Sequence, residues 1–129
     1  MPSKRVISIL AVQIRQTQEE LMDFMKQQHP EEIFVIEGVR GFFRGKSDVA
    51  VFNYIKTALF PHSVHIKASN LVFFKDNKQT IFEGLPQAYI DSYTDLVMNS
   101  PPEDLQTIWK FFQTLVGIYE LSLKNKKQK

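Results

Sequence analysis

Cysteine is absent from this chain of 129 residues. Its absence excludes disulfides, thiolate nucleophiles, and zinc or iron–sulfur sites that use cysteine ligands. A chain without cysteine also suits a reducing compartment, so we expect a cytoplasmic protein. Long apolar runs are absent as well, because no stretch approaches the roughly 20 apolar residues that a membrane-spanning helix needs. The sequence therefore predicts no membrane partner.

Excess charge is scarce in this chain, which has 16 Lys and Arg residues and 14 Asp and Glu residues, a formal net charge of +2. Much of the excess lies at the C-terminus, in Lys124, Lys126, Lys127 and Lys129. We therefore expect a single nearly neutral domain over residues 1–123 and a disordered basic tail over residues 124–129. This distribution gives little support to nucleic-acid binding by the domain as a whole.

Apolar residues are abundant, at 43% of the chain, and several short runs have the composition of strands. β-Branched and aromatic residues gather in five segments, each read as a strand: 6–14, 33–36, 63–67, 70–74 and 79–82. The last two flank a polar turn at residues 75–78, which favours a hairpin. Helical periodicity and capping residues predict three helices, over residues 17–28, from Pro86 to Val97, and 101–123.

Residues 48–59 are open between helix and strand, because their apolar side chains fall on one helical face while their composition also suits a strand. Taken as a helix that Ser47 or Asp48 caps, this segment completes the order β-α-β-α-β-β-β-α-α. The sequence then predicts an α+β fold, with a mixed sheet of about five strands and helices packed on it.

Phenylalanine occurs in three adjacent pairs, at positions 42–43, 73–74 and 111–112. Two neighbouring rings need apolar surroundings on two sides of one element, which a chain of this size offers sparingly. On the last helix, Phe111, Ile118 and Leu121 lie outside the main apolar stripe and form a second patch. This patch is either covered by the preceding helix or forms the seam of a homodimer. Our leading hypothesis is therefore a small non-catalytic interaction or assembly module that binds itself or another protein.

Segment 38–47 supports an alternative function. It reads as a loop with three glycines, in which two phenylalanines lie between cationic side chains: Arg40, Phe42, Phe43, Arg44 and Lys46. Rings flanked by cations bind single-stranded RNA or DNA by stacking and charge, and the lysine tail adds to this. Gly45-Lys46-Ser47 resembles the end of a phosphate-binding loop, but Arg40 stands where that pattern requires glycine.

Catalytic and metal-binding patterns are weak. His62 and His65 lie three residues apart in a predicted strand, where they would point to opposite faces and could not share a metal ion. No serine, histidine and carboxylate have the spacing of a recognisable catalytic motif. We therefore expect no cofactor, no metal site and no catalytic residues.

Overall fold

The computed structural model describes residues 3–127, and the surroundings of side chains up to residue 124. The chain is 86% helical, and no strand occurs within the described residues. The predicted α+β fold with a five-stranded sheet is therefore wrong, and the fold is all-α. The elements follow in the order α1 (Lys4–Gln28), η1 (Pro30–Glu32), α2 (Ile33–Arg44), α3 (Asp48–Tyr54), η2 (Ile55–Leu59), η3 (Phe60–His62), α4 (Ser63–Lys67), α5 (Leu71–Asp76), α6 (Lys78–Ile81), α7 (Gln87–Met98) and α8 (Pro102–Lys127).

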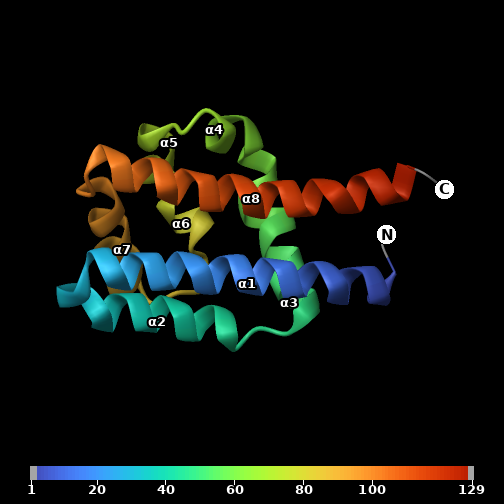
Figure 1. Ribbon diagram of the computed structural model, residues 1–129, viewed down its shortest axis with the longest axis horizontal. Coiled ribbons are helices and arrows are strands. Elements are labelled where there is room, and N and C mark those ends of the chain that lie inside the picture. The colour runs from blue at the N-terminus through green and yellow to red at the C-terminus, as the bar shows by residue number, and fades with distance from the viewer. Residues whose placement is uncertain (1–2, 128–129) are drawn as a thin grey trace.

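Two long antiparallel helices, α1 and α8, lie side by side, so that the start of α1 and the end of α8 lie at the same end of the molecule (Figure 1). Helix α2 packs along α1 on the side away from α8 and forms an outer edge of the molecule (Figure 1). Helix α3 and its π-helical continuation η2 run across both long helices, and the short helices α4–α6 with α7 complete the fold. Within the described residues, none of the helices combines the length and apolarity needed to cross a bilayer.

The predicted strand 6–14 is the first half of α1. Ile7, Leu10, Ala11 and Ile14 are all buried, at the spacing of one helical face. That face continues without a break into the region 17–28, which was correctly predicted as helix. Thr17 does not cap a helix, because its hydroxyl donates to the carbonyl of Gln13 one turn earlier. The small helix penalty of β-branched residues is outweighed here by the burial of a continuous stripe.

The predicted strand 33–36 and residues 38–44 of the predicted loop form helix α2, which ends at Arg44, while residues 45–47 form the turn that leads into α3. Ile36, Val39 and Phe43 recur at helical spacing and lie in the core. Gly38 and Gly41 do not open this segment into a loop, because both lie within the helix. At Gly38, an added Cβ would come within 2.7 Å of the Tyr89 ring.

The other predicted strands are short helices. Segment 63–67 is α4, and the predicted hairpin over residues 70–82 consists of α5 and α6. Asn70 starts α5 by accepting a hydrogen bond from the Phe73 amide at 3.0 Å. The helical alternative for residues 48–59 is confirmed, since the Ser47 side chain accepts from the Ala50 amide and caps α3. The two C-terminal helices were also correctly predicted, as α7 and α8.

An aromatic cluster forms much of the core between α8 and the short helices. Phe74 lies at its centre, with ring centroids 5.7 Å from Phe112, 5.8 Å from Phe82 and 6.1 Å from Trp109. Tyr93 of α7 extends the cluster by packing on Phe82. The predicted basic tail falls mostly outside this description: α8 continues to Lys127, but the side chains from residue 125 onward and residues 128–129 lie outside the described part of the chain.

Candidate interaction surfaces

The predicted seam on α8 is mostly packed against α1. The Phe111 ring lies 6.3 Å from the ring of Phe24, and Phe111 is half-buried. Ile118 is only 7% exposed, whereas Leu121 is 47% exposed. The helix that covers Phe111 is therefore α1 and not the preceding helix α7. Of the three seam residues, only Leu121 offers substantial apolar surface to a partner.

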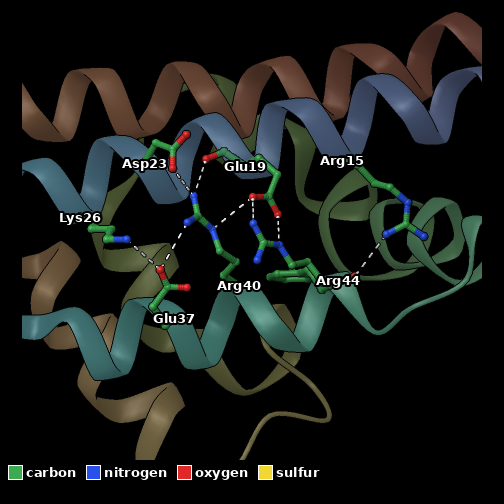
Figure 2. A network of polar contacts seen from close by, with 8 residues as sticks. Arg15, Glu19, Asp23, Lys26, Glu37, Arg40 and Arg44 are labelled. Atoms are coloured by element: carbon green, nitrogen blue, oxygen red, sulfur yellow. Dashed lines mark hydrogen bonds and ion pairs between the residues drawn. The ribbon is translucent and has the colours of Figure 1, made fainter.

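The arginines of the predicted binding segment are engaged in a charge network between α1 and α2 (Figure 2). Arg40 is 7% exposed and lies against the carboxylates of Glu19, Asp23 and Glu37. Its guanidinium also donates to the backbone carbonyl of Glu19 at 3.1 Å. A buried guanidinium with three carboxylate neighbours holds two helices together and is not available to a phosphate.

Arg44 extends this network at the surface. It donates to both oxygens of Glu19, from Nε at 2.8 Å and from Nη2 at 2.6 Å. These hydrogen bonds, with the nearby charge of Arg40, hold the pKa of the Glu19 carboxyl below its ordinary value of 4.5. Arg44 remains 59% exposed, so its pair with Glu19 faces water (Figure 2).

The aromatic residues of the same segment also contact the protein itself. Phe43 is buried and packs against Tyr54 and Phe42, with ring centroids 5.0 and 5.2 Å away. Phe42 is half-buried, and the ammonium of Lys46 lies 4.4 Å from the centre of its ring. The structure thus brings the five predicted residues close together, but their rings and most of their charges serve contacts within the chain.

Helix α2 carries an exposed apolar feature that the sequence analysis did not single out. Phe34 is 88% exposed and Ile33 is 40% exposed, at the start of the helix. Seven residues after Phe34, Gly41 is exposed, and a Cβ added there would meet no atom within 4 Å. Read as a strand, residues 33–36 gave no reason to expose Phe34. The helical spacing of Ile36, Val39 and Phe43 assigns the core to the opposite face of the helix. This spacing could have predicted from the sequence that Phe34 is exposed.

A surface cavity of about 380 Å³ lies beside His29, which follows the end of α1, and residues of α7 also line it. The His29 ring lies between Ser100 Oγ, 3.3 Å from Nε2, and the Glu31 carboxylate, 3.7 Å from Nδ1. The Ser100 hydroxyl donates its proton to the Leu96 carbonyl at 2.8 Å. Nε2 of His29 must therefore donate to Ser100, which is opposite to the direction that activates a serine nucleophile. This corner is suited to joining α1 to α7, not to acyl transfer.

Two tyrosines face a narrow space in the core that Gln18 also lines. The Tyr54 hydroxyl donates to the Ile81 carbonyl at 2.8 Å, whereas the Tyr93 hydroxyl has no hydrogen-bond partner among the described residues. Burial raises the pKa of both phenols. Both rings therefore stay neutral and act as structural side chains.

No group of three or more His, Cys, Asp or Glu side chains with the geometry of a metal site occurs within the described residues. Comparison of the chain with protein-family models, with curated proteins and with solved structures found no match.

Proposed function

We propose that this chain is a small non-catalytic interaction module that acts as a homodimer. The observation that carries the proposal is the exposure of Phe34, at 88%, on the outward face of α2. Single exposed apolar residues are common on proteins, but a phenylalanine this exposed, next to a half-exposed Ile33, is an anchor of the kind that interfaces bury.

The hydrogen bonds and ion pairs of the polar residues support a binding role over a catalytic one. Arg40 and Glu19 join α1 to α2, and the Ser100 hydroxyl donates to a backbone carbonyl. These side chains are committed to holding the fold together.

The nucleic-acid alternative finds less support in the contacts. Arg40 and Arg44 bind carboxylates of α1, and Phe43 is buried. This segment still offers the half-buried ring of Phe42 to a base and the ammonium of Lys46 to a phosphate. A gel-shift assay with single-stranded RNA and DNA at low salt separates the two functions, because a charge-driven complex forms there first. Retardation that is lost at high salt would favour the alternative.

Size-exclusion chromatography with light scattering tests the proposal. We expect the wild-type mass to rise with concentration from the 15.0 kDa of one chain toward twice that value. Leu121→Glu tests the α8 surface, and the residue is exposed enough for the change to leave folding intact. A wild type that stays monomeric at every concentration, or whose association requires nucleic acid, would refute the homodimer.

A further inference from the structure

We propose that the dimer forms by antiparallel pairing of α2 with α2 of a second copy, with Phe34 of each chain seated over Gly41 of the other. This inference rests on the proposed homodimer and specifies its contact surface. Phe34 and Gly41 lie on the same helix, seven residues apart. Seven residues correspond to roughly 700° of helical rotation, which leaves Phe34 and Gly41 within about 20° of each other on the same face.

The face that carries these two residues points away from the core. Ile36, Val39 and Phe43 hold the inner side of α2, and the helix lies at an outer edge of the molecule (Figure 1). Phe34 projects from the first turn of this outer face, while Gly41 leaves bare backbone two turns later. Gly45 prolongs the bare stretch, because a Cβ there would meet only carbonyl oxygens of Gly41 and Phe42. The face therefore presents one large projection and one shallow depression, and α7 borders it through the Tyr89 ring, which lies against Gly38.

A twofold axis makes the projection and the depression complementary. If the axis passes between residues 37 and 38, each Phe34 lies level with Gly41 of the second copy, about 5 Å along the helix from the axis. One contact then generates its symmetry mate, as in other closed dimers. The absence of a side chain at Gly41 lets the incoming ring approach the backbone, as small residues do where helices pack closely.

The charges at the two ends of α2 favour this orientation. Glu31 and Glu32 directly precede the helix, and Lys46 lies just beyond its end, whereas Arg44 in the last turn is paired with Glu19 and adds less positive charge. Antiparallel pairing places the acidic end of each helix beside the basic end of the other, whereas parallel pairing would bring like charges together. Antiparallel helices also align their dipoles favourably. Charge complementarity thus selects a second copy of this chain in one orientation.

The contact is small, since it involves one helix of 12 residues from each chain. Interfaces at the low end of the usual size range give weak, transient complexes. We therefore expect a dissociation constant in the micromolar range or weaker, and the experiments span concentrations from about 1 μM to 1 mM.

Two substitutions on the proposed face test the contact directly by sedimentation equilibrium. Phe34→Gln removes the ring from an exposed site, where it should leave the fold of the single chain intact. We expect it to weaken dimerisation at least about 30-fold, the effect typical of an interface anchor. Gly41→Leu fills the depression and should weaken dimerisation to a similar extent.

Gly41→Ala separates the interface from the fold, because its two effects have opposite signs. In the single chain an added Cβ enters open space and alanine favours the helix, so the unfolding temperature of dilute protein should rise. In the dimer the same methyl group occupies the space under Phe34, so association should weaken. Gly117→Ala in α8 is the matched control, since a Cβ there also meets no atom within 4 Å. It should stabilise the chain without changing the dissociation constant.

A charge exchange tests the orientation. Glu31→Lys and Lys46→Glu should each weaken the dimer by a few-fold at low salt, and the double variant should recover most of the loss. If the chain dimerises but Phe34→Gln, Gly41→Leu and Gly41→Ala leave the dissociation constant unchanged, the α2 contact is wrong while the homodimer stands. Loss of association on Leu121→Glu would then place the contact on α8. A chain that is monomeric at about 1 mM would refute both.

Discussion

The Nε atom of Arg40 lies 3.2 Å from Oε1 of Glu19, and this pair joins the middle of α2 to the middle of α1. The distance is that of an ion pair, although the Nε–H group makes no hydrogen bond. Arg40 is buried, whereas its carboxylate partners Glu19, Asp23 and Glu37 remain partly exposed to water. The sequence suggested Arg40 as a ligand-binding residue, and its position gives it a structural role.

Replacing Arg40 should therefore cost more stability than replacing Arg44. Arg40→Met leaves three carboxylates around one apolar side chain, and because these can still be hydrated we expect a loss of about 1–3 kcal/mol. Arg44→Met removes a pair that faces water, so the loss should stay below about 1 kcal/mol. Urea unfolding of both variants measures the difference. Equal losses would mean that burial of Arg40 has no energetic consequence.

Acid should destabilise the protein through Glu19. Hydrogen bonds from Arg44 lower the pKa of this carboxyl in the folded state, so the unfolded chain takes up its proton first as the pH falls. The stabilisation is complete above the ordinary value of 4.5 and is lost as the pH falls through the lowered one. Glu19→Gln should flatten the dependence of unfolding free energy on pH in this range.

Asp91 provides the comparison for that experiment. Hydrogen bonds from Lys78 and Gln87 lower the pKa of its carboxyl. This group therefore also makes the folded state less stable as the pH falls, below about its ordinary value of 3.8. Asp91→Asn should therefore flatten the curve below about pH 3.8, whereas the effect of Glu19→Gln begins below about pH 4.5. An acid dependence that neither substitution changes would show that other carboxylates control it.

The two buried tyrosines should respond in opposite ways to loss of their hydroxyl groups. Tyr54→Phe leaves the buried Ile81 carbonyl without its donor, which should cost about 1–2 kcal/mol. Tyr93→Phe removes a hydroxyl that has no partner among the described residues, so stability should stay unchanged or rise by about 1 kcal/mol. Thermal unfolding compares the two. A loss on Tyr93→Phe as large as that on Tyr54→Phe would indicate a hydrogen bond to Tyr93.

Two glycines of α2 should differ sharply when changed to alanine. Gly41→Ala adds a methyl group in open space and should stabilise dilute protein by about 0.5–1 kcal/mol. Gly38→Ala places a Cβ 2.7 Å from the Tyr89 ring, so the ring must shift or α2 and α7 must move apart, and we expect a loss of about 1–3 kcal/mol. Both values come from chemical denaturation at one low concentration. Similar stabilisation by both changes would mean that the Tyr89 ring moves freely aside.

The sequence predicted some helices well because their signals were local. Ser47 caps α3 through one hydrogen bond, and the apolar stripe of α8 runs for several turns. Prolines mark the starts of α7 and α8. In each case, a capping residue or a long periodic stripe favoured a single interpretation.

The fold class could not be predicted because short apolar runs suit either structure. Residues 6–14 and 33–36 have the composition of strands, and their helical state depends on burial against partners far along the chain. For example, Ile14 and Ile36 are completely buried by tertiary packing, not by local preference. The candidate interface was missed for the same reason. Residues 33–36 were interpreted as a strand, but in the helix that they form Ile36 faces the core and Phe34 faces solvent. The helix that covers Phe111 was equally beyond reach, since α1 is distant from α8 in sequence.

Sedimentation equilibrium of the wild type beside Phe34→Gln tests the central claim most directly. The account predicts that the wild-type mass climbs from 15.0 kDa toward twice that value as concentration increases, while Phe34→Gln needs a concentration at least about 30-fold higher for the same rise. Two proteins that both remain at 15.0 kDa up to about 1 mM would contradict it.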